Sequence, residues 1–132
     1  MNILLDSNVL IALSDIDHIS HALASEWFAG SGGLFATCPV TQGALIRFML
    51  RARAGTTIAQ AKRLLARILA LPGHEFWPDS VSYLELPEAG VTGYRQVTDA
   101  YLVALARHHN SRLATLDRAL SAIHSPIAFL IA

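Results

Sequence analysis

The sequence has few charged residues and a single cysteine. Charged side chains make up 15% of the 132 residues, against about 25% in an average soluble domain. Hydrophobic side chains make up 53%, which excludes intrinsic disorder because disorder requires low hydrophobicity. Basic and acidic residues are equal in number, 10 of each, which argues against a polycation that binds nucleic acid by charge alone. Cys38 is the only cysteine, so an internal disulfide is excluded and a reducing, cytoplasmic location is the default expectation.

The sequence also lacks an apolar run long enough to span a bilayer, although its mean hydropathy is +0.42. The longest central uncharged stretch, residues 27–46, is broken by glycines and a proline. The N-terminus has no basic segment of the kind that begins a signal peptide. The length predicts one domain over residues 1–132, and the apolar excess favours a partner or a self-interface rather than a membrane.

The zero net charge conceals an uneven distribution. Residues 1–26 hold four acids and no lysine or arginine, whereas residues 27–74 hold six basic residues and no acid. Residues 75–132 hold six acids and four arginines. Such a division can place a basic surface beside an acidic pocket. The alternative is that the basic residues only solvate the faces of two helices.

Short apolar runs alternate with helical patterns along the chain. Helices are expected from residue 17 or 20 to about 29, and over 9–13, 39–53, 58–71, 94–109 and 117–123. Strands are expected over 3–5, 34–37, 74–77, 112–116 and 127–131, with one helical turn inside the connecting segment 78–93. This alternation predicts an α/β fold of three layers, α/β/α, whose central, mostly parallel sheet has four to five strands.

Two aspartates stand where strands are expected to end. Asp6 follows strand 3–5, and Asp117 follows strand 112–116. Ligands of open α/β sheets bind in the crevice outside the carboxyl ends of the strands. If these strands are neighbours, both carboxylates point into one crevice. Each aspartate also begins a helix, so an ordinary N-cap is the alternative for either one.

Asp99 belongs to a helix that is apolar nearly all round. Only Thr98 and Asp99 are strongly polar between residues 97 and 106, and a helix of this kind is usually buried. A buried carboxylate is normally paired or bound to a metal ion. The alternative partner is Arg95, four residues earlier, in an exposed helical ion pair.

Three carboxylates with no histidine near them in the sequence favour a hard, oxygen-preferring ion such as Mg²⁺ or Mn²⁺. Such an ion activates a water molecule and neutralises the oxygens of a phosphodiester. The six histidines show no zinc-type spacing, and the chain has no Walker-type phosphate loop and no nucleophile elbow. Cys38, directly before Pro39, is interpreted as a small buried side chain rather than a nucleophile.

Four segments, in order along the chain, together resemble PIN-domain nucleases, and more narrowly the VapC toxins of bacterial type II toxin–antitoxin pairs. They are LLDSNVL at 4–10, CPVTQGALIR at 38–47, VTDAYL at 97–102 and ATLD at 114–117. The resemblance extends over essentially the whole chain. It implies a PIN-like fold and a Mg²⁺- or Mn²⁺-dependent endoribonuclease that cleaves structured RNA, tRNA or rRNA, to stop translation. It also implies a homodimer and a cognate VapB-type antitoxin that covers the active site.

By position, the resemblance assigns the acidic metal ligands to Asp6, Asp99 and Asp117. Asn8, Thr115 and Thr98 match polar residues that support the site. Gln42 stands where the family pattern usually has a glutamate. Glutamine keeps an oxygen acceptor but has no charge, so the sequence predicts weaker binding of a second metal ion. A solvated helix residue is the alternative for Gln42.

The basic middle of the chain gains a role from this resemblance. Arg47, Arg51 and Arg53 follow Gln42 on the same predicted helix and are candidates to contact RNA phosphates or the antitoxin. A groove for an antitoxin helix is expected from apolar residues of the helices 39–53 and 58–71, namely Leu45, Phe48, Met49, Leu64 and Leu65. The alternative is that at least half of these residues belong to the core.

Two other functions compete with the nuclease. A binding module that acts on its antitoxin or RNA without efficient cleavage would be consistent with the loss of the acid at Gln42. A phosphatase of the haloacid-dehalogenase kind would also place an aspartate after the first strand. That chemistry requires a second aspartate two residues later, where this chain has Asn8.

Overall fold

Five short parallel strands form the middle layer of the protein, in the order β3-β2-β1-β4-β5. The computed structural model describes all residues, 1–132. Every neighbouring pair of strands is parallel, so all carboxyl ends lie along one edge of the sheet. The strands are β1 (Ile3–Leu5), β2 (Phe35–Thr37), β3 (His74–Phe76), β4 (Leu113–Thr115) and β5 (Ala128–Leu130).

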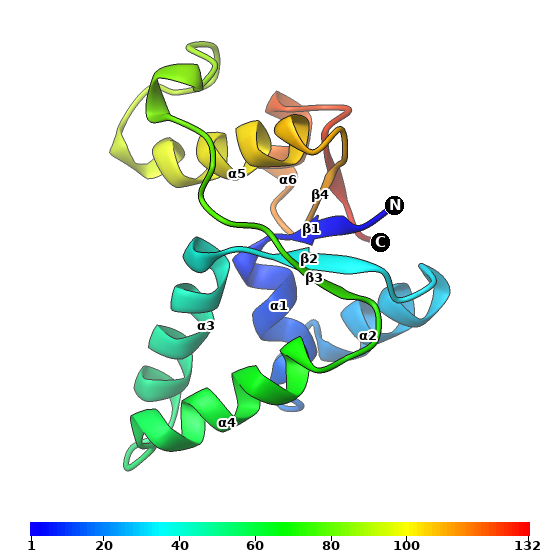
Figure 1. Cartoon of the computed structure of the whole chain (residues 1–132), viewed down its shortest axis with the longest axis vertical. Coiled ribbons are helices and arrows are strands. Elements are labelled where there is room, and N and C mark those ends of the chain that lie inside the picture. The colour runs from blue at the N-terminus through cyan, green and yellow to red at the C-terminus, as the bar shows by residue number, and fades with distance from the viewer.

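Helices cover both faces of the sheet, which confirms the three-layer α/β/α fold (Figure 1). One face is covered by α1 (Ser7–Ser14), α2 (His21–Gly30), α3 (Pro39–Ala52) and α4 (Ile58–Leu69); the other by α5 (Val97–His108) and α6 (Arg118–Ile123). Two 3₁₀ turns, η1 (Tyr83–Glu85) and η2 (Tyr94–Gln96), lie in the connection before α5. None of these helices has both the length and the apolarity needed to cross a bilayer.

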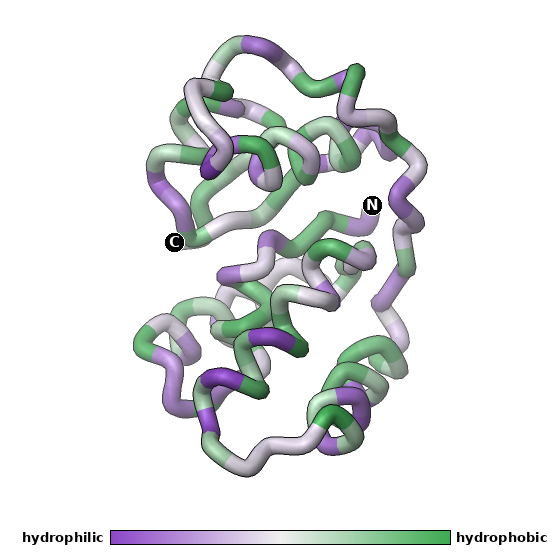
Figure 2. The backbone as a smooth tube through the Cα atoms, turned by 90° about the vertical axis from the view of Figure 1, so that its left-hand side faces the viewer, coloured by the Kyte–Doolittle hydropathy of each residue, from purple (hydrophilic) through white to green (hydrophobic).

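The alternation of side chains along each strand divides the core in two. Leu4 of β1 belongs to the hydrophobic cluster beneath α5, and its neighbour Leu5 belongs to the cluster formed with α1 to α4. Successive strand residues point to opposite faces, so a strand covered on both sides must be apolar throughout. The helices α1 to α4 behave differently. Figure 2 shows hydrophobic and hydrophilic residues alternating along the helices below the sheet, because one side of such helices faces solvent.

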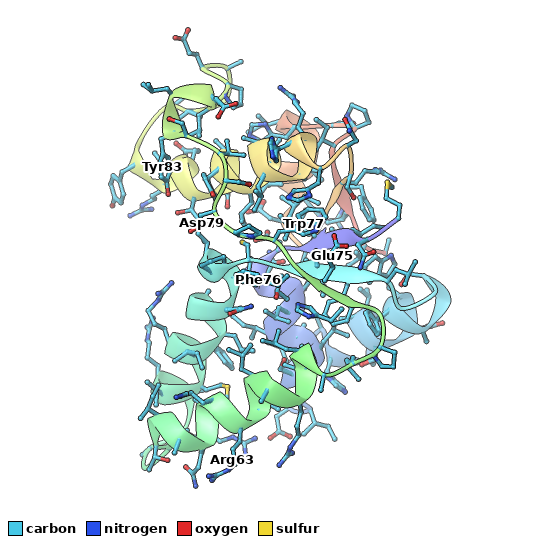
Figure 3. The ribbon with its side chains drawn as sticks, in the orientation of Figure 1. Arg63, Glu75, Phe76, Trp77, Asp79 and Tyr83 are labelled. Atoms are coloured by element: carbon cyan, nitrogen blue, oxygen red, sulfur yellow. The ribbon has the colours of Figure 1, made fainter.

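The chain winds outward from the centre of the sheet twice. Strands β1, β2 and β3 occupy one half, after which the chain crosses back to place β4 on the other side of β1. In this crossing Trp77 is buried and its ring stacks on that of His109, with ring centroids 3.8 Å apart. Figure 3 follows the crossing from Glu75 through Asp79 to Tyr83, which lies at the opposite end of the molecule from Arg63 of α4. Since the chain proceeds from β1 to one side of the sheet and from β4 to the other, the point between β1 and β4 is the topological switch point, where α/β sheets bind ligands.

The prediction of a helix over 94–109 is wrong for its first three residues. Residues 94–96 form the 3₁₀ turn η2, and the α-helix begins at Val97. The backbone of Gly93 is fully extended (φ −168°, ψ −179°), so the chain enters this element from an extended conformation and passes through a tighter turn first. The first helix, expected over 9–13, in fact begins at Ser7 because Asp6 caps it.

Candidate functional site

Asp6 lies at the switch point and is only 6% exposed. It is the N-cap of α1, and its Oδ1 accepts a 2.7 Å hydrogen bond from the backbone N–H of Ser7. Its other oxygen, Oδ2, accepts a 2.7 Å hydrogen bond from the hydroxyl of Thr115. Burial raises the pKa of this carboxyl, the two hydrogen bonds oppose the rise, and the charge of Asp117 adds to it. Asp6 is thus an N-cap and also a buried charge at the edge of the sheet.

Thr115, the last residue of β4, connects Asp6 to the start of α6. Its hydroxyl oxygen accepts from the backbone N–H of Asp117 at 3.0 Å and from Nδ2 of Asn8 at 3.4 Å. Oδ1 of Asn8 in turn accepts from the backbone N–H of Leu116 at 3.1 Å. Asp117 caps α6 by accepting from the backbone N–H of Leu120. The structure therefore places Asn8 and Thr115 between the two aspartates that they were expected to support.

Asp99 lies in the first turn of α5, the helix that covers the other face of the sheet (Figure 1). Desolvation raises its pKa to about 6, with further contributions from the charges of Asp6 and Asp117. The alternative ion pair with Arg95 does not form, because both ion pairs of the chain involve Arg53. Nε of Arg95 donates to the hydroxyl of Tyr94 at 3.3 Å. The N-caps of α1 and α6 and the first turn of α5 thus bring three carboxylates near enough for the charges of Asp6 and Asp117 to act on Asp99, and none of the three forms an ion pair with a basic residue.

The chemistry of these donors fits a divalent cation. Mutual repulsion between partly buried carboxylates is relieved by a positive charge, and carboxylate oxygens are the ligands that Mg²⁺ and Mn²⁺ prefer. No group of three or more histidine, cysteine, aspartate or glutamate side chains is gathered closely enough to enclose an ion. A closed set is not required for Mg²⁺, which usually keeps several waters and binds through one or two carboxylates.

Gln42 and Thr98 are placed differently from the three aspartates. Gln42 is half-buried in the first turn of α3, and its Nε2 donates to the hydroxyl of Thr37 at 3.0 Å. A hydrogen bond thus joins the Gln42 side chain to the last residue of β2. Thr98 is exposed, and no hydrogen bond joins its hydroxyl to the other candidates.

The arginines of α3 and of its C-cap differ in their ion pairing. Arg53 forms ion pairs with Asp17, at 3.1 Å, and with Asp15, at 3.9 Å, in the segment after α1. Arg47 and Arg51 are exposed and form no ion pair. Arg47 folds back along α3, with Nη1 3.3 Å from the point where a Cβ on Gly43 would stand. The uncompensated positive charge on α3 is therefore that of Arg47 and Arg51.

A cavity of about 460 Å³ opens between α3, α4 and the end of α1. Four of the five apolar residues expected to form a groove line it, while Leu65 packs against the core beneath the sheet. Leu45 is fully buried at the bottom of this cavity. The four lining residues are Leu45, Phe48, Met49 and Leu64.

Two further residues in contact, Thr37 and His74, were not among those predicted from the sequence. Thr37 ends β2 and is fully buried, and its hydroxyl lies 2.7 Å from Nε2 of His74. The rule that identified Asp6 and Asp117, a polar residue at the carboxyl end of a parallel strand, would have identified Thr37 as well. No local pattern marks His74, because its contact depends on how β3 pairs with β2.

Comparison with known proteins gives a consistent result. A model of the PIN domain family matches residues 3–125. The chain is 48% identical over 131 residues to ribonuclease VapC29 of Mycobacterium tuberculosis, covering 99% of this chain and 97% of the relative. It is 42% identical over 118 residues to ribonuclease VapC38 of the same organism, covering 86% and 84%.

Two solved structures share the fold. PAE2754 from Pyrobaculum aerophilum matches with a TM-score of 0.64 at 22% identity, covering 99% of this chain and 84% of that one. VapBC2 from Rickettsia felis, solved bound to a DNA fragment from its promoter, matches with a TM-score of 0.65 at 18% identity over the full length of both chains.

Proposed function

Because the chain belongs to the PIN-domain family, we propose that it is a metal-dependent endoribonuclease of the VapC kind. In this proposal it is the toxin of a type II toxin–antitoxin pair and cleaves structured RNA, tRNA or rRNA, to inhibit translation and growth. The names of its relatives support the RNA substrate. The observation that carries the proposal is the convergence of three carboxylates on the switch point, where burial raises the pKa of Asp99 and the charges of Asp6 and Asp117 raise it further.

Asp6, Asp99 and Asp117 are the residues that would hold Mg²⁺ or Mn²⁺. When bound, such an ion lowers the pKa of a coordinated water and neutralises charge on phosphate oxygens. The residues of the chain then hold the site in place. Thr115 orients one carboxylate oxygen of Asp6, and Asn8 fixes Thr115 against the start of α6. Because burial raises the pKa of Asp99 to about 6, the charge of this carboxyl changes at pH values just below neutrality.

The RNA contact is assigned to Arg47 and Arg51, whose charges no acid of the chain offsets. Arg53 was expected to share this role, but Asp17 and Asp15 offset its charge, which makes it a weaker candidate than Arg47 and Arg51. The partner proposed for the cavity between α3 and α4 is a helix of a VapB-type antitoxin. We also propose a homodimer, one domain over residues 1–132, and a location in the cytoplasm.

The test is cleavage of total RNA by the purified protein with Mn²⁺, with Mg²⁺ and with EDTA. Cleavage with either ion, and none with EDTA, is expected. RNA that stays intact under all three conditions, with protein that is folded by circular dichroism, would reject the nuclease and favour the second candidate.

That second candidate is a PIN-like binding module that acts through its antitoxin or RNA without efficient cleavage. One observation favours it, namely the uncharged Gln42 in place of the usual acid. The two functions differ in one measurement, since the binding module retains RNA binding in Mn²⁺ and leaves the RNA uncut.

A further inference from the structure

Gln42, Thr37 and His74 form a chain of hydrogen bonds that reaches from α3 to β3. Nε2 of Gln42 donates to the hydroxyl oxygen of Thr37 at 3.0 Å, and that oxygen lies 2.7 Å from Nε2 of His74. These are the only two partners of the Thr37 side chain, which is fully buried. The position of each proton in this chain can therefore be worked out.

The amide N–H of Gln42 is a donor and cannot accept the hydroxyl proton of Thr37. That proton has one remaining acceptor, the Nε2 lone pair of His74. If Nε2 of His74 carried a proton, Thr37 would accept twice and its own O–H would be buried without a partner, at a cost of about 1–3 kcal/mol. The arrangement therefore requires neutral His74 with its proton on Nδ1.

The surroundings of His74 agree with a neutral ring. Its side chain packs beside that of Phe35, with ring centroids 5.2 Å apart. Burial lowers the pKa of His74, while the Leu69 carbonyl and the charge of Glu75 oppose this change. No other charged group contributes to the shift.

We infer that His74, acting through Thr37, is a positioning residue that holds the Gln42 amide with Oε1 as its free polar atom. Oε1 has no hydrogen-bond partner within the chain, so Gln42 offers an uncharged oxygen acceptor at the start of α3. A carboxylate at position 42 could not donate to Thr37. The hydroxyl proton of Thr37 would then turn to residue 42, and Nε2 of His74 would have to supply a proton instead. The amide of Gln42 and the unprotonated Nε2 of His74 thus both find their hydrogen-bond partner in Thr37, which a carboxylate at position 42 would not allow.

This inference deepens the proposed function and depends on it for its catalytic meaning, but its first test does not involve activity. NMR of the ¹⁵N-labelled protein at neutral pH is expected to show His74 as the Nδ1–H tautomer. One side-chain amide proton of Gln42 is expected to exchange slowly. Thr37→Val should abolish this protection, and Thr37→Ser should keep it. An Nε2–H tautomer, or an amide proton unaffected by Thr37→Val, would overturn the inference.

The second test is Gln42→Glu. The pKa of His74, followed by NMR titration, is expected to rise relative to the unmodified chain, because Nε2 loses its donor and a carboxylate stands at the other end of the chain of hydrogen bonds. Unchanged titration of His74 would mean that Thr37 does not transmit the state of residue 42.

In RNA cleavage, Thr37→Val is expected to lower kcat by about 10-fold with little change in KM, as for residues that orient a ligand. Thr37→Ser is expected to keep kcat near that of the unmodified chain. Equal kcat in Thr37→Val would overturn the positioning role. Failure of the proposed function is recognised separately, because it would appear as absent cleavage in the unmodified chain while the NMR results still held.

Discussion

Thr115 donates its hydroxyl proton to Asp6 across 2.7 Å, although the two residues are 109 positions apart in the sequence. The hydrogen bond joins neighbouring strands β1 and β4 at their carboxyl ends. It brings the first and last parts of the candidate site together, and it offsets part of the cost of burying a carboxylate.

Thr115→Val should therefore destabilise the protein by about 1–3 kcal/mol, because it removes a donor from a buried carboxylate and an acceptor from Asp117 and Asn8. Thr115→Ser keeps the hydroxyl and should be less destabilising. Urea unfolding followed by circular dichroism measures both. A valine variant as stable as the unmodified chain would mean that water replaces the hydroxyl at no cost.

Asp6→Asn should lower the rate of RNA cleavage by on the order of 100-fold or more, because it removes one of the negative charges that attract a bound cation. Growth arrest on expression should disappear with it. Glu26→Gln is the matched control, since Glu26 is an exposed acid of α2 whose removal should leave both unchanged. Toxicity that persists in Asp6→Asn and in Asp99→Asn would exclude the metal-nuclease mechanism.

Asp99 should make the metal-free protein less stable as pH rises. Its pKa is about 6 in the folded chain against 3.8 for a free side chain, so the unfolded state ionises first. The penalty is absent below about pH 4, develops between pH 4 and 6, and is complete above pH 6. Asp99→Asn should thus be more stable at pH 8, by about 1 kcal/mol after allowance for solvent screening, or roughly 4 °C in Tm.

Thermal unfolding at pH 4 and at pH 8 checks this prediction, and the two proteins should unfold at similar temperatures at pH 4. Added Mn²⁺ should then raise the Tm of the unmodified chain more than that of Asp99→Asn, because a ligand stabilises the state that binds it. A lower Tm for Asp99→Asn at pH 8 would show that the carboxylate is stabilised by a partner other than a cation.

Arg47→Glu and Arg51→Glu should each weaken RNA binding and reduce its dependence on salt, since each removes a cation that neutralises a phosphate. The slope of log K against log salt should fall by about 1 for each phosphate that is no longer neutralised. Binding is measured with Asp6→Asn in the background so that RNA stays intact. Arg67→Glu on α4 is the matched control for charge, and an equal effect of all three would mean that only net charge matters.

The fold could be predicted from the sequence to the extent that local patterns determine it. The runs at Ile3–Leu5 and Leu113–Thr115 are apolar nearly throughout because both faces of their strands are covered. The strand order depends on contacts between distant segments, which one sequence does not display. The predicted start of α5 was wrong for a local reason. The extended Gly93 precedes a 3₁₀ turn whose side-chain pattern resembles that of a helix.

The candidate site was predictable where position along the chain implies position in space. Asp6 and Asp117 each follow a strand, and parallel strands end at one edge, so their proximity follows once β1 and β4 are neighbours. The partner of Gln42 was not predictable. Its amide is held by Thr37 and His74, and His74 reaches Thr37 only through the pairing of β3 with β2.

The position of the switch point also has a consequence for synthesis of the protein. Asp6 is synthesised 109 residues before Thr115, and β4 completes the hydrogen bonding of β1 only when residues 113–115 are available. A nascent or prematurely terminated chain that ends before Leu113 lacks one wall of the site. If the protein is a ribonuclease that acts on the translation machinery, incomplete copies are harmless to the ribosomes that make them.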